Sequence, residues 1–476
     1  MNYVFYDFET SGTDANFDQP IQLAAILTNE NFEILDEPIN EICKLKEGVI
    51  ANPRALLVNK VDIELLKSAQ CFYDFMDNIH EKLTSWSPAT FIGYNSIFFD
   101  EEFLRNSLYQ SLHDPYLTNT NSNNRADLYK IVLGLKALNV NAIKFPMNET
   151  TGRISLKLES IAKENNIEQK KAHDALSDVY ATIGVANLIK KNESDYWEEC
   201  MNMNNPNDMI DYLSSDKFFF AAPTHATNDK FMPLSYLTTN PNYDKELAFF
   251  DLNHNPSKYL DEKSSSISSM IGGKNKPIKI VKTNKSSIIL SADFIKSKGI
   301  YNEADTMMYD ERTNELSQCD RFINNINQAL VDRLTDYQID NQSHELEKQL
   351  YGGGFYSDSD KNKIKSFKKT SNPVEKYNIS KQYDDKRLRE ISYRFLFTKY
   401  PEVFTPDELN QRKDFIAAKV FSNNGNEKWC TLDKAKNEIE AIKNESSNQN
   451  LKGYINEIEK YIKSEEEKYK SYLVNS

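Results

Sequence analysis

The chain is poor in cysteine, with five in 476 residues, at positions 43, 71, 200, 319 and 430. Because this number is odd and the positions are scattered, we exclude a disulfide framework and expect a reducing, cytoplasmic location. No stretch of about 18 apolar residues occurs, so no membrane-spanning helix is expected. A strand pattern begins at residue 3, which leaves no room for a signal peptide.

Other common binding signatures are also missing. The six histidines are scattered and do not cluster with cysteine, which argues against a zinc site. The glycine run at 352–354 follows no predicted strand, so it is interpreted as a loop and not as a phosphate-binding loop.

Positive charge is in deficit, since 58 Lys and Arg face 71 Asp and Glu, a net charge of −13. Proteins that bind nucleic acid usually present a basic surface, so any such surface here must be local. Lysine clusters at 274–285 and 361–369 can line a groove for a single strand, and a solvated face explains them equally well.

Hydrophobic residues make up 39% of the chain and aromatic residues 12%, enough for true cores. Strand patterns at 3–9, 21–28, 34–43 and 90–93, with helical patterns at 100–111, 126–138, 156–165 and 174–190, predict an α/β domain with a mixed sheet. Short β-rich runs follow at 218–222, 246–251, 278–281 and 287–292, with a helix after residue 320 and a flexible loop at 264–269. The last part, from about 343, looks helical and charged.

An acid pair stands in the first predicted strand. Residues 3–8 are aromatic or β-branched apart from Asp7, which favours a strand. Because side chains alternate across a strand, Asp7 and Glu9 point to the same face. Adjacent carboxylates repel each other unless a cation neutralises them, and Mg²⁺ or Mn²⁺ prefers such oxygen ligands. On this segment alone, two solvated acids at a strand edge are an equally good interpretation.

Further candidate ligands lie along the chain. Asp100 ends an aromatic run, and Asp174 is a plausible N-cap of the helix expected at 174–190. Asp178 would lie about one turn inside that helix, with His173 just before it. Five positions do not share one helical face, so this pair suits a metal ligand, Asp178, and a nearby base, His173. Taken alone, His173 is more often structural or exposed.

These motifs, taken in order, carry a resemblance. Asp-x-Glu-Thr at 7–10, the run from Asn95 to Asp100, and His-x-Ala-x-x-Asp at 173–178 resemble the His-containing branch of the DEDD 3′→5′ exonuclease superfamily. Further stretches, at 105–106, 114–116, 158–159 and 349–358, resemble the exonuclease I family of single-strand-specific exodeoxyribonucleases. The resemblance spans most of the chain, is densest before residue 190 and is thinner after 390.

The resemblance implies a ribonuclease H-like exonuclease domain at 1–192, an SH3-like domain at 193–342 and a helical C-terminal domain at 343–476. It implies hydrolysis of single-stranded DNA from the 3′ end, releasing nucleoside 5′-monophosphates, processively and in DNA repair or recombination. Two Mg²⁺ ions, or Mn²⁺ as a substitute, would sit between the carboxylates, with His173 as general base. The expected metal ligands are Asp7, Glu9, Asp100 and Asp178, and the expected substrate contacts are Glu9, Thr10, Asn95, Phe99 and Lys157. The implied partners are single-stranded DNA and the acidic tail of single-stranded-DNA-binding protein, and a monomer is expected.

One position departs from the family pattern. Lys157 stands where the family carries a substrate-contacting arginine, so the charge is kept and the bidentate fork is lost. A solvated lysine is the alternative.

The aromatic residues 98, 99, 103, 109 and 116 can stack on unpaired bases, although core packing is their commoner role. Two rival functions remain, an RNA-trimming exonuclease of the same superfamily and a non-catalytic binder of single strands.

Overall fold

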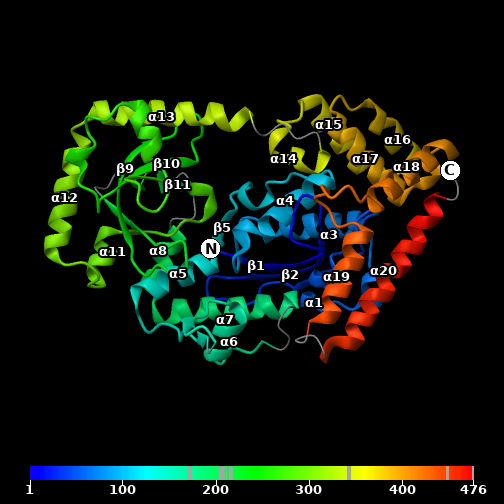
Figure 1. The fold of residues 1–476 in the computed structure, drawn as a ribbon, viewed down its shortest axis with the longest axis horizontal. Helices are drawn as coiled ribbons and strands as arrows, with labels where there is room; N and C mark the ends of the chain where they lie inside the picture. Colours follow the sequence, from blue (N-terminus) through cyan, green and yellow to red (C-terminus); the bar gives the residue numbers. More distant parts are fainter. Residues whose placement is uncertain are drawn as a thin grey trace.

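The computed structural model describes residues 1–148, 150–169, 174–202, 209–210, 212–213, 218–339, 345–445 and 450–473, with side chains left out over 334–339. These residues form two five-stranded sheets, a two-stranded ribbon and a group of C-terminal helices (Figure 1). None of the described helices combines the length and the apolar character needed to span a bilayer.

The first sheet has the strand order β3-β2-β1-β4-β5. Strand β1 pairs antiparallel with β2 and parallel with β4, so the expected mixed sheet is confirmed. Its strands are β1 (Tyr3–Thr10), β2 (Pro20–Thr28), β3 (Ile39–Ile42), β4 (Thr90–Gly93) and β5 (Asn124–Asp127). The start of the expected helix at 126–138 was wrong, because Asp127 ends β5 and its side chain caps the helix that follows.

Eight helices accompany this sheet in the described chain: α1 (Pro53–Asn59), α2 (Ile63–Ser68), α3 (Phe72–Ser85), α4 (Asp100–Gln110), α5 (Leu128–Leu138), α6 (Leu158–Glu164), α7 (Ala175–Asn192) and α8 (Ser194–Asn202). The even-numbered residues from 4 to 8 of β1 pack into a core with α3 and α4, whereas Tyr3 and Phe5 pack into another core with α5, α7 and α8. Since side chains alternate along a strand, Asp7 and Glu9 point to the face of Tyr3 and Phe5, which α7 covers.

The second sheet, β11-β10-β9-β8-β12, is antiparallel throughout and lies on the left in Figure 1. Its strands are β8 (Phe219–Ala221), β9 (Met232–Thr239), β10 (Glu246–Asp251), β11 (Ile278–Lys282) and β12 (Ile289–Ser291), and its helices are α10 (Ser264–Ile267), α11 (Ala292–Ser297), α12 (Glu303–Ser317) and α13 (Asp320–Ile339). The expected flexible loop at 264–269 was wrong: this segment is helical, and Ile267 is fully buried in the core.

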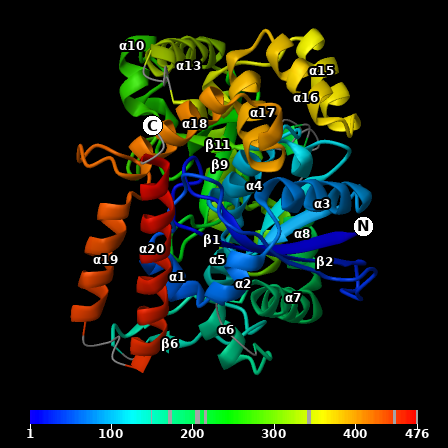
Figure 2. The same ribbon diagram turned by 90° about the vertical axis from the view of Figure 1, so that its right-hand side faces the viewer.

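The C-terminal helices are α14 (Gln349–Gly352), α15 (Asp358–Lys369), α16 (Pro373–Gln382), α17 (Lys386–Lys399), α18 (Pro406–Val420), α19 (Leu432–Asn444) and α20 (Lys452–Leu473). They share a core with one face of the first sheet. Helices α19 and α20 lie beside α1 (Figures 1 and 2). The domain limits at 192 and 342 stay a prediction.

Candidate active site

Two elements bring three carboxylates together. Strand β1 supplies Asp7 and Glu9, and α7, which covers that face, supplies Asp178 from its first turn. One carboxylate oxygen from each of these residues lies within 4.8 Å of the other two. Glu9 is buried and the other two are partly buried. The interpretation of Asp7 and Glu9 as solvated acids at a strand edge was therefore wrong.

The fourth carboxylate, that of Asp100, comes from α4, which packs into the core on the other face of β1. Asp100 is the first residue of α4 and is 4% exposed. The backbone N–H of Phe8 donates to Asp100 Oδ1 at 3.0 Å. Because Phe8 lies between Asp7 and Glu9, this bond fixes Asp100 against the segment that carries the other two acids.

Burial and mutual repulsion disfavour the ionised form of these carboxylates. Burial raises the pKa of Asp7 well above its usual value, and the charges of Asp100, Glu9 and Asp178 raise it further. Burial, with the charges of Asp178 and Asp100, raises the pKa of Glu9 to about 8. The pKa of Asp100 rises to about 7, because burial outweighs the hydrogen bond from Phe8. A cluster of this kind suits a bound cation.

The helix that carries Asp178 begins as expected, with the Asp174 side chain accepting from Ser177 N–H. The predicted base, His173, lies outside the described residues. A neighbour that was not predicted is Gln169, whose amide nitrogen donates to Asp178 Oδ1 at 2.7 Å. No spacing signal in the sequence points to that contact.

Three of the expected substrate contacts line one cleft. Glu9, Thr10 and Phe99 contribute to a cleft of about 970 Å³, and Trp429 from the C-terminal part lines it too. The Thr10 hydroxyl donates to the carbonyl oxygen of Gly12 at 2.7 Å, which holds the end of β1 in place. The cleft therefore opens beside the carboxylates.

The two other expected contacts do not line this cleft. Asn95 has a left-handed backbone (φ 63°), and its N–H donates to Asp127 Oδ1 at 2.8 Å. The side chain of Lys157 is 76% exposed and its ammonium lies 3.7 Å from Glu159. Their contact with a substrate stays a prediction.

Some lysines of the two predicted clusters form ion pairs with carboxylates. Lys282 lies 2.9 Å from Glu246, and Lys368 lies 2.7 Å from Asp77. Part of each cluster therefore forms ion pairs within the protein and is not simply a solvated face.

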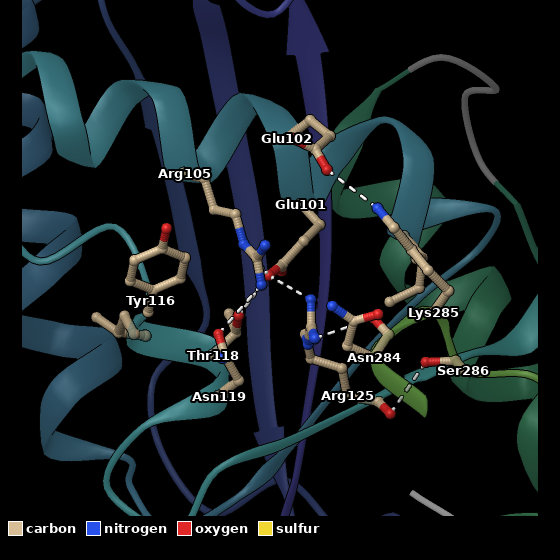
Figure 3. A network of polar contacts seen from close by, with 12 residues as sticks. Glu101, Glu102, Arg105, Tyr116, Thr118, Asn119, Arg125, Asn284, Lys285 and Ser286 are labelled. Carbon is tan, nitrogen blue, oxygen red and sulfur yellow. Dashed lines mark hydrogen bonds and ion pairs between the residues drawn. The ribbon is translucent and has the colours of Figure 1, made fainter. Parts of the chain in front are cut away.

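Glu101, which follows Asp100 on α4, is the centre of a buried polar network (Figure 3). Glu101 Oε1 accepts from Arg105 at 2.8 Å, from Arg125 at 2.9 Å and from Thr118 at 2.6 Å. The network was not predicted. The four-residue spacing of Glu101 and Arg105 on an expected helix is the one signal that could have suggested it.

Two family models match the chain, an exonuclease model over residues 4–186 and an exonuclease I C-terminal domain model over 344–465. Exodeoxyribonuclease I of Escherichia coli K12 is 26% identical over 449 residues, which cover 87% of this chain and 92% of the relative. That of Buchnera aphidicola from Acyrthosiphon pisum is 27% identical and covers 83% and 96%. That of Buchnera aphidicola from Schizaphis graminum is 36% identical over a shorter match, 46% of this chain and 45% of the relative.

Solved structures agree on the fold. E. coli exonuclease I in complex with a dA16 oligonucleotide superposes with a TM-score of 0.83 at 22% identity, over 98% of this chain and 99% of that one. A complex described as SSB/exonuclease I with the inhibitor CFAM gives a TM-score of 0.79 at 22% identity, over 97% and 99%. With both parts of the family pattern present and relatives matched along most of its length, the chain belongs to the exonuclease I family.

Proposed function

We propose that this chain hydrolyses single-stranded DNA from its 3′ end and releases nucleoside 5′-monophosphates. The observation that carries the proposal is the meeting of Asp7, Glu9 and Asp178 within 4.8 Å, with Asp100 tied to the same strand. The exonuclease model and the exodeoxyribonuclease I relatives support the same activity.

The donor set fits a hard divalent cation. Burial and like charge raise the pKa values of Asp7 and Glu9, so a cation would relieve a cost that the folded protein otherwise carries. We assign Mg²⁺, two ions, with Mn²⁺ as a substitute, because both prefer oxygen ligands and two-ion sites suit phosphodiester hydrolysis. Bound there, the ions would neutralise charge at the phosphate and acidify a water.

The residues of the chain hold and orient the reacting groups. The Phe8 N–H fixes the Asp100 carboxylate, and Gln169 fixes that of Asp178. His173 is assigned the role of accepting the proton of the attacking water, because imidazole titrates near neutral pH. Thr10, at the edge of the cleft, is assigned to the terminal nucleotide.

Single-stranded DNA is the proposed substrate, and single-stranded-DNA-binding protein is a proposed partner. Both assignments are supported by what the structures of related enzymes contain. Processive action, a role in DNA repair and a monomeric state are proposed from family membership. The cytoplasmic location stays a prediction from the cysteine pattern.

The test is a time course on end-labelled oligonucleotides of DNA and RNA, single- and double-stranded, with and without Mg²⁺. We expect metal-dependent release of mononucleotides from single-stranded DNA, and protection by a blocked 3′ end but not by a blocked 5′ end. Protection by a blocked 5′ end would overturn the polarity. Faster digestion of RNA would favour the RNA-trimming alternative, and binding without shortening would favour the non-catalytic one.

A further inference from the structure

One aromatic side chain near the carboxylates is open to solvent. Phe98, in the 3₁₀ turn Ser96–Phe98, is 61% exposed, whereas Phe103 and Tyr109 on the following helix are 1% and 3% exposed. An apolar ring of this size is usually buried when nothing else requires it at the surface. Of the five aromatic residues predicted as base-stacking candidates, Phe103 and Tyr109 belong to the core, Phe99 and Tyr116 are half-buried, and Phe98 is exposed.

Two lysines from different parts of the chain meet at this ring. Lys130 Nζ, from α5, lies 4.8 Å from the centre of the Phe98 ring, and Lys285 Nζ, from the turn after β11, lies 5.1 Å from it. Lys130 also donates to the carbonyl oxygen of Lys285, which ties the two lysines together. An exposed ring flanked by ammonium groups offers both a stacking surface and positive charge.

The position of the ring relates it to the reaction site. Phe98 precedes Asp100 by two residues, a separation of at most about 7 Å along the chain. Phe99, between them, lines the cleft that holds Glu9 and Thr10, while Phe98 lies beside Lys130 of α5 and Lys285 of the turn after β11. A strand whose 3′ terminus lies in the cleft can therefore pass the Phe98 ring on its way out.

We propose that Phe98, with Lys130 and Lys285, forms a platform on which a base on the 5′ side of the scissile phosphate stacks in single-stranded DNA. This inference rests on the proposed function and adds a subsite to it. The phosphates next to that base face the two ammonium groups. A base in a duplex keeps its faces in the stack, so the platform selects unpaired strands.

The charge balance is compatible with this role. Lys285 Nζ lies 3.2 Å from Glu102 Oε1, and both side chains are about three-quarters buried, so this lysine is held in place before the strand arrives. A phosphate would share Lys285 with Glu102, and Lys130 is itself partly buried and already donates to the carbonyl oxygen of Lys285. We therefore expect stacking on Phe98 to contribute more to binding than either lysine does.

The experiment measures binding without cleavage, by fluorescence anisotropy of a labelled dT10 in EDTA. Phe98→Ala and Phe98→Leu should weaken binding by roughly 5- to 150-fold, the range for losing one stacked base, and Phe98→Trp should retain it. The matched control is Phe415→Ala on α18, a ring that is 55% exposed with Arg412 5.2 Å from its centre. Its affinity should equal that of the wild type.

A second series locates the base. Single abasic residues are placed at the second, third or fourth position from the 3′ end of dT10. One of these positions should weaken binding to the wild type and have no further effect on Phe98→Ala, because both changes remove the same contact. Equal abasic costs in the two proteins at every position, or full affinity of Phe98→Leu, would overturn the platform.

The lysines give a third readout. Lys130→Met should reduce the slope of log affinity against log salt by about one, as expected for the loss of one phosphate contact. An unchanged slope would remove Lys130 from the platform. All three measurements are independent of hydrolysis, so a wild-type protein that binds but does not cut would refute the proposed function and leave the platform supported.

Discussion

Arg125 donates from Nη1 to Glu101 Oε1 at 2.9 Å, and the two side chains are 8% and 1% exposed. Glu101 follows Asp100 on α4, so this buried pair anchors the helix that presents a proposed metal ligand. Arg125 also donates from Nη2 to the carbonyl oxygen of Asn284, in the second part of the chain, at 3.1 Å (Figure 3). From the C-terminal part, the Tyr351 hydroxyl donates to Glu102 Oε2 at 2.7 Å. The start of α4 is thus where all three parts of the chain meet.

Glu101→Gln should destabilise the protein strongly. Burial favours the neutral form of Glu101, and the charges of Arg125 and Arg105 outweigh it and keep the pKa of Glu101 low. The substitution leaves two buried guanidinium groups without their counter-charge, which costs about 3–5 kcal/mol when a buried pair is broken. Urea unfolding monitored by circular dichroism measures the loss.

The control for this prediction is Glu64→Gln. The Glu64 side chain is 84% exposed and pairs with Lys67, so this substitution breaks an exposed ion pair. Exposed pairs contribute about 0–1 kcal/mol, so this variant should unfold close to the wild type. Equal unfolding midpoints for both variants would contradict the anchoring role of Glu101.

Asp7→Asn and Asp178→Asn should abolish hydrolysis and leave the protein folded. In the metal-free protein each substitution removes one of several repelling charges, so the melting temperature at pH 8 should rise. Mg²⁺ should stabilise the wild type, by about 2.7 kcal/mol at a hundred times its dissociation constant, and should have little effect on either variant. Thermal melts with and without Mg²⁺ test this, and retained turnover in either variant would refute the ligand assignment.

The sequence predicts the position of a site residue correctly where the repeat of a single strand or helix determines it. The alternation of β1 places Asp7 and Glu9 on one face, and the period of α7 places Asp178 in its first turn, so both positions follow from local pattern. Nothing local indicates that the polar segment Asn124–Asp127 is a strand. It is one because it pairs with β4, which lies about thirty residues earlier in the chain.

Apart from the i,i+4 pair of Glu101 and Arg105, the network around Glu101 could not be predicted from the sequence, for the same reason. Arg125 is 24 residues from Glu101, and the carbonyl that it also contacts, that of Asn284, is a further 159 residues away. The first contact depends on how α4 packs beside β5, and the second on how the turn after β11 meets β5; neither follows from spacing within one element. The exposure of Phe98 beside the buried Phe103 likewise depends on packing, since both residues are aromatic and close in sequence.

Acid should destabilise the protein through His80. Its ring stacks on that of His113, with centres 4.1 Å apart. The charged neighbours are Asp77 on α3 and Lys368 on α15, and Lys376 on α16 lies close to these two charges. Burial lowers the pKa of His80 to about 4, and the charges of His113 and Lys368 act in the same direction.

The unfolded chain has the ordinary histidine pKa of about 6.5, so between pH 6.5 and 4 it binds more protons than the folded protein. The stability that the neutral His80 contributes is complete above pH 6.5 and is lost as the pH falls towards 4. His80→Gln should therefore flatten the loss of stability between pH 7 and pH 4.5 in urea titrations. The exposed His225, changed to Gln, is the control, and an unchanged acid dependence in His80→Gln would contradict the assignment.

Lys157→Arg should improve binding of single-stranded DNA. Lys157 is the N-cap of α6 and its ammonium is largely exposed, 3.7 Å from Glu159, so a larger head group meets no steric barrier. A guanidinium can bind a phosphate through two parallel hydrogen bonds, whereas an ammonium acts as a point charge. A gain of about 1 kcal/mol, roughly fivefold in affinity, is expected from the additional charge-assisted bond.

Lys163→Arg, on the same helix, controls for a general effect of arginine. If Lys157→Arg and Lys157→Ala both bind dT10 as the wild type does, then position 157 is simply solvated and the strand takes another path.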